Sequence, residues 1–210
     1  MAESDSAAGQ RAPIRLLLAS SNAGKLREYR QLARGSAFDL ELLPNFRGLA
    51  PFEETAPTFA ENAVGKALYY GRFTDEMLMA EDSGLVVPAL GGAPGVYSAR
   101  YAGPQGTDAD CVQKLLREMA GKSGAERRAR FVCVTALARG GRALAVVSDL
   151  VEGMIADEPR GTHGFGYDPV FLLPDIGRTS AEILQDEKNR ISHRGKAFRK
   201  IRDNLTNPSF

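Results

Sequence analysis

The chain has 210 residues, and its 27 Lys and Arg nearly balance its 26 Asp and Glu, giving a formal charge of +1. A near-neutral chain does not bind nucleic acid by bulk electrostatic attraction, so any bound anion must be held by local groups. The composition, 43% hydrophobic and 25% charged, is that of an ordinary globular protein. No apolar run approaches the roughly 18 residues that cross a bilayer, so we predict no membrane span.

Two features of the sequence bear on the compartment. Residues 1–13 carry acidic side chains and lack the apolar core of a signal peptide, so we predict a disordered tail there. Cys111 and Cys133 lie in apolar-periodic segments, without the spacing of a zinc site or a redox pair. They fit buried thiols in a reducing compartment, which predicts a cytoplasmic protein.

The N-terminal half alternates apolar runs with amphipathic segments, as is typical of an α/β protein. Predicted strands cover residues 14–19, 38–43 and 77–80. The first helix follows the first strand and places Tyr29 on its apolar face and Glu28 outside. Thr58 and Glu61 have the spacing of a capping box, which marks the start of a second helix. The loop before it, residues 44–57, is long enough to indicate a functional role.

The C-terminal half contains a strand pair that two glycines separate, so a hairpin is predicted there. The predicted elements are turns over 90–106, a helix over 107–119, strands over 129–138 and 142–151, and an apolar run over 170–173. A capping box of Thr179 and Glu182 predicts a further helix, and a last helix precedes a frayed end over 207–210. No linker separates two units. Residues 14–206 are therefore predicted to form a single α/β domain, a mixed sheet flanked by helices.

The turn between the first strand and the first helix offers groups that bind phosphate. It reads Ser20-Ser21-Asn22-Ala23-Gly24-Lys25, which combines helix N-terminal amides, two hydroxyls and an ammonium group. It is not a Walker A loop, because the leading glycine is missing and Leu26 stands where a Ser or Thr holds magnesium. The segment alone fits a phosphate cradle and an ordinary N-cap turn equally well.

Paired carboxylates occur in two places, Glu81-Asp82 after an apolar strand and Glu53-Glu54 in the long loop. Neighbouring residues on a strand point to opposite faces, so Glu81 and Asp82 share one site only if the chain has already turned. A carboxylate here could hold Mg²⁺ or take a proton from water. Each pair has a commoner alternative. Glu53 and Glu54 could be solvated surface acids, and residues 81–84 could form an ordinary Asp-Ser-Gly turn.

Residues 161–169 form a glycine-rich segment that contains two aromatic side chains. Glycines such as Gly166 let the backbone approach a flat ligand, while Phe165 and Tyr167 offer rings that can stack on a purine. Asp168 adds an acceptor for the N–H groups of a base edge. Two aromatic residues in so flexible a segment favour a binding role.

Cations cluster at the predicted junction between the last two helices. Lys188 precedes the junction and His193-Arg194 follow it, with Ser192 placed to cap the last helix. Such cations suit a phosphate or the carbonyl of a base. Because further basic residues follow, a plain charged junction and a modest RNA-binding patch are the alternatives.

Six strings occur in this chain in an order that closely resembles the inosine/xanthosine triphosphate pyrophosphatase family. They are SSNAGKLRE, TFAENA, EDSGL, GGAPGVYSARYAG, GFGYDPVF and EKNRISHRG. The resemblance covers about residues 14–205, and the strings GGAPG and SHRG are highly specific for it. Two departures are Ser21, where many members have Gly, and Glu81, where Asp is more usual; both keep the type of chemistry.

The resemblance implies an elongated mixed sheet with two lobes and an active-site cleft between them. It also implies a homodimer that hydrolyses dITP, ITP or XTP to the monophosphate and pyrophosphate with Mg²⁺. Asp82 matches the proton acceptor and a Mg²⁺ ligand, and Glu53 or Glu54 matches a further ligand. The implied substrate contacts are Ser20, Ser21, Asn22, Ala23, Gly24, Lys25, Ser83, Phe165, Gly166, Tyr167, Asp168, Lys188, His193 and Arg194.

A hypothesis from a different class is a non-catalytic module that binds purine nucleotides or RNA. The acidic set and the near-zero net charge argue against it. We therefore expect a polarised site, in which Lys25, Lys188 and Arg194 face the carboxylates of the loop and of Asp82 across one cleft, with the triphosphate between them.

Overall fold

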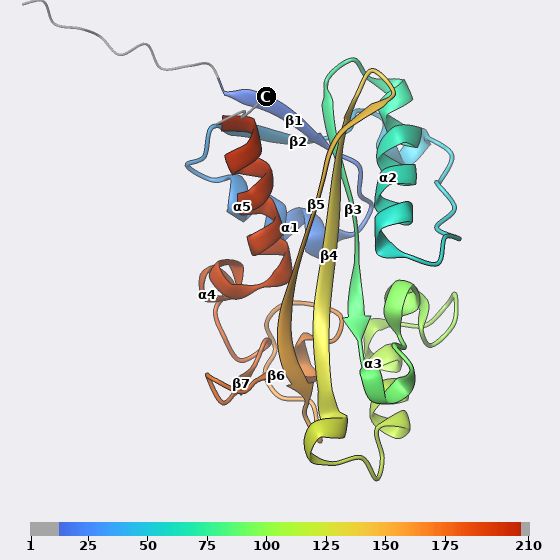
Figure 1. Cartoon of the computed structure of the whole chain (residues 1–210), viewed down its shortest axis with the longest axis vertical. Coiled ribbons are helices and arrows are strands. Elements are labelled where there is room, and N and C mark those ends of the chain that lie inside the picture. Colours follow the sequence, from blue (N-terminus) through green and yellow to red (C-terminus); the bar gives the residue numbers. More distant parts are fainter. Residues whose placement is uncertain (1–12, 207–210) are drawn as a thin grey trace, which may run out of the picture.

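The computed structural model describes residues 13–206, so residues 1–12 of the predicted tail and the predicted frayed end over 207–210 lie outside the described residues. The chain forms a seven-stranded sheet in the order β2-β1-β3-β4-β5-β6-β7. Its long central strands run along the long axis of the molecule (Figure 1). The strands are β1 (Ile14–Leu18), β2 (Phe38–Leu42), β3 (Met77–Val86), β4 (Arg128–Arg139), β5 (Arg142–Ile155), β6 (Phe171–Leu173) and β7 (Arg178–Thr179).

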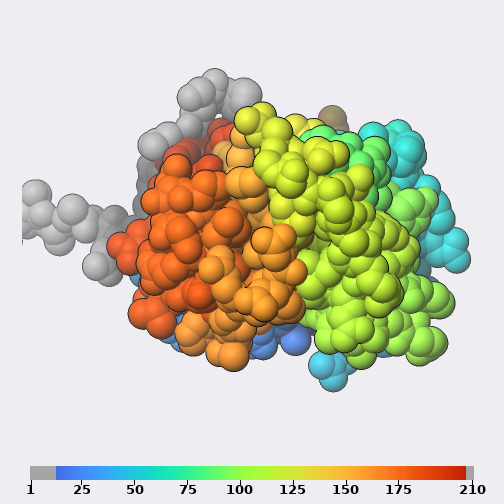
Figure 2. Space-filling view, turned by 90° about the horizontal axis from the view of Figure 1, so that it is seen from below, coloured from blue at the N-terminus to red at the C-terminus, as the bar shows by residue number. Residues whose placement is uncertain are grey.

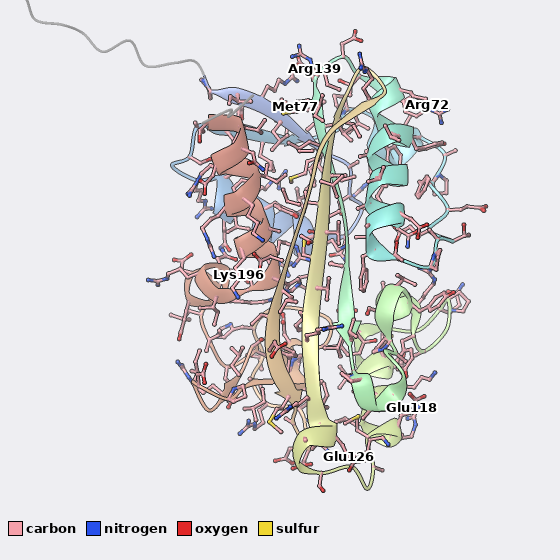
Figure 3. The ribbon with its side chains drawn as sticks, viewed as in Figure 1. Arg72, Met77, Glu118, Glu126, Arg139 and Lys196 are labelled. Carbon is pink, nitrogen blue, oxygen red and sulfur yellow. The ribbon has the colours of Figure 1, made fainter. Side chains whose placement is uncertain are left out.

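The sheet is mixed, as predicted. β1 pairs in parallel with β2 and β3, whereas each later pair is antiparallel. The predicted hairpin joins β4 to β5 through Gly140 and Gly141, whose φ angles of 55° and 70° suit glycine. This hairpin spans the molecule, because Arg139 at its turn lies at the opposite end from Glu126, which precedes β4 (Figure 3).

Helices cover both faces of the sheet. They are α1 (Ala23–Ala33), α2 (Phe59–Tyr70), α3 (Asp108–Glu118), α4 (Gln185–Ile191) and α5 (His193–Thr206). The helices α1 and α5 pack on one face, where Tyr29 and Phe198 join the β1 side chain of Leu16 in one core cluster. α2 packs on the other face, against Leu17 and Leu78 (Figure 1). None of the described helices is long and apolar enough to cross a membrane.

A third core cluster fills the end of the sheet that α3 covers. Leu115 of α3 packs there with Leu85 of β3 and Phe171 of β6. Figure 2 looks onto this end, where the yellow-green part of the chain that includes α3 adjoins the orange part that includes β6 and β7. The long strands thus connect two differently covered ends of one sheet, which agrees with the elongated mixed sheet that was expected.

Side-chain caps fix where three of the helices begin. Asn22, Thr58 and Ser192 each accept a hydrogen bond from the amide three residues further on, at 3.0, 3.2 and 3.1 Å. Each thereby satisfies one of the amide groups that the first turn of a helix leaves without a partner. The predicted starts of α2 and α5 are therefore confirmed, and the turn after β1 is held by Asn22.

The turn considered for residues 81–84 is not present. These residues continue β3, in an antiparallel ladder that pairs Asp82 with Val134 and Gly84 with Val132. Local Asp-Ser-Gly turn chemistry is overridden because β4 supplies a complete row of backbone partners. The strand consequently reaches Val86 without interruption.

The helix predicted at Thr179 and Glu182 is also wrong. Thr179 belongs to β7, and α4 begins only at Gln185. The amide of Thr179 does donate to the Glu182 carboxylate, at 2.7 Å. However, the amide of Ser180 donates to the carbonyl of Phe171 at 2.9 Å, and this pairing holds the segment extended.

Candidate functional site

A cavity of about 670 Å³ lies beside β3, where segments of all five helices converge with three loops, residues 46–54, 96–100 and 165–168. Its volume is in the range of small-molecule binding sites. Every site residue predicted from the sequence lines it, except for Ala23, Gly24 and Glu53. The structure therefore brings together segments that are up to about 170 residues apart in the chain.

One end of the cavity is formed by the turn after β1. Ser20, Ser21 and Asn22 line it, and the Ser20 hydroxyl accepts from the amide of Asn22 at 3.2 Å. The ammonium group of Lys25 reaches the cavity 3.0 Å from a carboxylate oxygen of Glu81. Burial opposes its charge, but the neighbouring carboxylates, Glu81 first, raise the pKa of Lys25. Lys25 is therefore a cation at neutral pH.

Gly24 does not line the cavity but packs against an aromatic residue of its wall. A Cβ atom at Gly24 would lie 2.6 Å from ring atoms of Phe165. The close approach of α1 to this ring therefore requires the glycine. In this way Gly24 positions Phe165, although it does not line the cavity itself.

Glu81 and Asp82 point to opposite faces of the sheet, as the alternation of a strand predicts. Glu81 points toward α1 and α5, where Tyr29 donates to it and Arg194 donates to both of its oxygens at 2.9 and 2.8 Å. Burial disfavours its charge, but Arg194 and Lys25 hold the pKa of Glu81 well below its ordinary value. Glu81 is therefore a permanently charged counter-ion.

Asp82 points toward α2 and borders the cavity. Its Oδ2 accepts from the Asn62 side chain at 3.1 Å, and its Oδ1 accepts from the amide of Ser83 at 2.9 Å. Burial raises the pKa of Asp82, and the nearby ammonium groups of Lys25 and Lys66 do not fully offset this effect. The two adjacent carboxylates thus have opposite pKa shifts, which gives them different chemistry.

The long loop brings one carboxylate of its pair into the cavity. Glu54 lines it and forms an ion pair with Lys66 of α2, at 2.6 Å, whereas Glu53 does not line it. The same Lys66 ammonium group donates to the carbonyl of Glu81 at 3.0 Å. Arg100 holds the loop from the other side, by donating to the backbone carbonyl of Glu54 at 2.7 Å.

A buried ionic network surrounds Lys188 and Arg194, which both line the cavity. Glu28, expected on the exposed face of α1, is only 2% exposed, because it accepts from Arg194 and, at 2.7 Å, from Lys188. Burial disfavours its charge, but these two cations lower the pKa of Glu28 to about 2. Lys188 also contacts Asp168, at 2.5 Å. The cations Lys188 and Arg194 are thus paired with Glu28, Glu81 and Asp168, and not with the carboxylates that were expected to face them.

Two hydrogen bonds attach the glycine-rich loop to neighbouring segments, and two cations lie near its phenylalanine ring. The amide of Gly166 donates to Asp108 at the start of α3 (2.8 Å), and the Tyr167 hydroxyl donates to the carbonyl of Ser98 (2.8 Å). Phe165 lies between cations, with the Lys188 ammonium group 5.2 Å and the Arg194 guanidinium group 5.5 Å from its ring centre. The loop therefore presents a held aromatic ring to the cavity.

His193, the first residue of α5, is buried beside Arg194. Its ring stacks on Phe131 with 4.8 Å between ring centres and 12° between planes. Nδ1 of His193 is the one buried side-chain polar atom among residues 13–206 without a hydrogen-bond partner. Burial, reinforced by Arg194, holds the pKa of His193 well below its ordinary value, so the ring is neutral.

Sequence reasoning missed several residues that complete the site: Glu28, Asn62, Lys66, Arg100 and Asp108. Asn62 and Lys66 had a usable signal, because they are polar residues four apart on the same face of a helix as Ala63 and Ala67. Glu28, Arg100 and Asp108 had none, since their partners are distant in the sequence.

The donor set at the cavity fits Mg²⁺ in its chemistry. Residues 13–206 contain no group of three or more His, Cys, Asp or Glu side chains arranged to hold a metal ion. Asp82 and Glu54 nevertheless both border the cavity. Mg²⁺ prefers oxygen ligands, keeps several waters and is commonly held by one or two carboxylates together with substrate phosphates. Two carboxylates beside a phosphate-sized space meet that requirement.

Comparison with known proteins agrees with this arrangement. The family model described as "Ham1 family" matches residues 16–204. The chain belongs to the Ham1 family. One relative, the dITP/XTP pyrophosphatase of Geobacillus kaustophilus, is 50% identical over 186 residues, which cover 89% of this chain and 91% of the relative. The dITP/XTP pyrophosphatase of Bacillus subtilis is 43% identical over 185 residues, which cover 88% of this chain and 93% of that protein.

Solved structures of the Ham1 family have the same fold. The Ham1 protein of Coxiella burnetii is 42% identical, with a TM-score of 0.81, and the match covers 92% of this chain and 98% of that one. The nucleoside-triphosphatase (dITP/XTP pyrophosphatase) of Mycobacterium abscessus is 36% identical, with a TM-score of 0.69, and the match covers 91% of this chain and 100% of that one. The predicted family and the predicted mixed sheet flanked by helices are thereby confirmed, whereas the two lobes with a cleft between them stay a prediction.

Proposed function

We propose that this chain hydrolyses dITP, ITP and XTP between the α- and β-phosphates, giving the monophosphate and pyrophosphate, and so removes non-canonical purine nucleotides. One observation carries the proposal: a single cavity has a helix N-terminus with Lys25 at one side, the carboxylates of Asp82 and Glu54 beside it, and the Phe165 ring at another wall. These groups suit a triphosphate, a metal with a water, and a purine base. The names of the relatives support the same substrate class.

The triphosphate is bound in this proposal by the turn after β1 and by two ammonium groups. Amides at the start of α1 and the hydroxyls of Ser20 and Ser21 provide donors, and the helix dipole favours an anion there. The ammonium groups of Lys25 and Lys66 both line the cavity. They would stabilise the charge that develops on the pyrophosphate leaving group. Lys188 contacts the Phe165 wall, so we assign it to the base end.

Asp82 is the proposed proton acceptor for the water that attacks the α-phosphorus. It is ionised at neutral pH, yet its pKa is raised, which makes it a stronger base than an ordinary Asp. Asp82 and Glu54 would hold Mg²⁺, and Glu54 is preferred over Glu53 because it borders the cavity. Mg²⁺ bound there would neutralise phosphate charge and lower the pKa of a bound water.

Selectivity for the base follows from its 6-position. Hypoxanthine and xanthine carry a carbonyl acceptor there, whereas adenine carries an amino donor. A donor at the base end of the cavity would pair with this carbonyl, so adenine would leave that donor unpaired. Such a mismatch costs roughly 1–3 kcal/mol per buried group. Arg194 and the amide of Gly166, which are donors there, have internal partners in Glu28, Glu81 and Asp108 and are not assigned to this contact.

The direct test measures pyrophosphate release from dITP, ITP, XTP, ATP and GTP, each with and without Mg²⁺. We expect Mg²⁺-dependent release, with the inosine and xanthosine nucleotides at least about 10-fold faster than ATP, as one unpaired buried donor predicts. Equal rates on ATP, or orthophosphate as the sole product, would contradict the proposal.

A non-catalytic RNA-binding module is the competing function, and the contacts of the basic cluster disfavour it. Lys196, on the α5 side of the sheet (Figure 3), donates to the carbonyl of Leu150 at 3.0 Å. Lys200 donates to Ser148 and Arg199 to Arg190, both at 2.7 Å to backbone carbonyls. Because these cations have intramolecular partners, we expect weak RNA binding with a shallow salt dependence in filter assays.

We also propose a homodimer that works in the cytoplasm. Both cysteines are buried free thiols, which is consistent with a reducing compartment. The side chain of Tyr97 is half-exposed on the loop before α3, a surface that suits a second copy. Sedimentation velocity at low micromolar concentration would distinguish a dimer from a monomer.

A further inference from the structure

We propose that Asn62 is a positioning residue that fixes the Asp82 carboxylate and the Glu54 loop relative to each other. The inference rests on the function proposed above, because it assigns these two carboxylates to the reaction. Asn62 lies in the second turn of α2, is 0% exposed and does not line the cavity. It therefore acts through its neighbours and not on a ligand.

One carboxamide group binds both carboxylate-bearing segments. Nδ2 of Asn62 donates to Asp82 Oδ2 at 3.1 Å and to the carbonyl of Ala56 at 3.3 Å. Its Oδ1 accepts from the amide of Ala56 at 3.1 Å. Ala56 follows Glu54 by two residues, so the loop is attached to α2 through both polar groups of one residue. The amide of Ser83 holds the other oxygen of Asp82, so one donor fixes each oxygen.

Lys66 spans the same two elements one helical turn later. Its ammonium group contacts Glu54 at 2.6 Å and the carbonyl of Glu81 at 3.0 Å. Residues four apart share a helix face, so Asn62 and Lys66 form two parallel links from loop to strand. Lys66 lines the cavity, where a phosphate could reach its ammonium group, whereas the neutral, fully buried Asn62 does not line it.

The chemistry of this position requires an amide. A carboxamide provides donors for Asp82 and for the Ala56 carbonyl, together with an acceptor for the Ala56 amide. An Asp of the same size would keep only the acceptor and would place a like charge against Asp82. An Ala would leave buried polar groups of Ala56 and Asp82 without partners.

The test compares Asn62→Ala and the isosteric Asn62→Asp with a control that loosens the same loop elsewhere. Tyr69→Phe is that control, since its hydroxyl donates to the loop carbonyl of Ala50 at 3.2 Å but touches neither Asp82 nor the cavity. Pyrophosphate release from dITP gives kcat and KM, and hydrogen exchange reports the amide of Ala56. Loss of a group that orients metal ligands typically costs 10–100-fold in activity or metal affinity.

We expect kcat to fall by about 10–100-fold in both Asn62 variants, while KM for dITP changes by less than about threefold. The Ala56 amide should exchange at least about 10-fold faster in Asn62→Ala, because its hydrogen bond is lost. Tyr69→Phe should remain within about twofold of the unsubstituted protein in kcat. Asn62→Asp keeps the shape of the side chain. If Asn62→Ala folds poorly, the kcat of Asn62→Asp therefore tests the inference by itself.

Two results would overturn the inference. The first is a kcat of Asn62→Asp within twofold of that of the unsubstituted protein. The second is a fall in the kcat of Tyr69→Phe as large as that of the Asn62 variants, which would indicate general loosening of the loop. Failure of the proposed function is a separate result, namely no pyrophosphate release by the unsubstituted protein. The exchange rate at Ala56 then still decides whether Asn62 holds the loop, because unchanged exchange in Asn62→Ala contradicts that role.

Discussion

Two neighbouring carboxylates, Glu81 and Asp82, show how single residues acquire different chemistry from their surroundings. Both are buried, and burial raises the pKa of each. Glu81 faces Arg194 and Lys25, which reverse this effect, so its charge is fixed. Asp82 has weaker compensation, so its pKa stays above the ordinary value of an Asp, which makes it the better proton acceptor of the two. Groups whose environments separate their pKa values in this way commonly have separate catalytic roles.

At the residue scale we predict the effect of Asp82→Asn. The amide cannot accept a proton or bind Mg²⁺ as a carboxylate does, so kcat for dITP should fall by at least about 10²-fold. Binding of dITP, measured by calorimetry, should remain within a few-fold, because Lys25, Lys66 and the turn after β1 are untouched. Asp39→Asn, an exposed change on β2, is the control. Retained turnover would remove Asp82 from the proposed role.

Among the elements, α1 has two functions, because its N-terminus borders the phosphate region and its first turn supports Phe165. The variant Gly24→Ala separates them. Ala favours a helix over Gly by up to about 1 kcal/mol, but the crowding of a buried ring costs about 1–3 kcal/mol, so the melting temperature should be unchanged or lower. The new Cβ would meet the Phe165 ring at 2.6 Å, and this ring must move.

We expect Gly24→Ala to raise KM for dITP by about 5–50-fold with little change in kcat, because stacking on the base contributes equally to the ground state and the transition state. Steady-state kinetics check this result. Gly48→Ala is a suitable control, since nothing lies within 4 Å of its added Cβ. An unchanged KM would show that Phe165 does not contact the base.

The elements could be predicted from the sequence where periodicity and caps acted locally. Thr58 and Ser192 cap the helices that they were expected to cap, and the glycine pair forms the hairpin. Residues 81–84 could not be predicted, because their extended form depends on pairing with β4, about 50 residues later. The extended form of Thr179 could not be predicted for the same reason, because its pairing with β6 prevails over the local capping pattern.

The sequence predicted which segments line the candidate site, but it did not predict which charged residues of the site pair with each other. Sequence strings located the segments that line the cavity, yet Glu28 was expected outside. Its burial depends on Arg194, 166 positions away, and on Lys188, 160 positions away. Helical periodicity describes which face a residue occupies but carries no information on which distant charge will meet it.

At the scale of the whole molecule, a small group of charged residues is buried in the interior, although most of the charged side chains lie on the surface. Glu28, Glu81, Asp168, Lys188 and Arg194 are all buried, and together they connect α1, β3, the glycine-rich loop, α4 and α5. Removing one partner would leave an uncompensated buried charge, which typically costs 3–5 kcal/mol. The global stability therefore depends on the protonation of a few interior groups.

His193 makes this dependence measurable. In the folded chain the pKa of His193 lies well below 6.5, so the buried ring stays neutral, whereas the unfolded chain binds a proton below pH 6.5. The unfolded state then holds more protons, and the free energy of unfolding must fall as the pH decreases through this window. The slope for one such group approaches about 1.4 kcal/mol per pH unit, which is a loss of about 2 kcal/mol between pH 6.5 and 5.

Urea unfolding from pH 7 to 5 of the unsubstituted protein and of His193→Phe tests this expectation. Phe retains a ring that can stack on Phe131, and it has no titratable group. Any constant offset between the two curves reflects packing, so the difference in slope is the measurement that matters. We expect the stability of the unsubstituted protein to decrease more steeply below pH 6.5, by about 2 kcal/mol at pH 5. Parallel curves would mean that His193 takes up its proton without unfolding, and that the interior of the α4–α5 junction admits a charge.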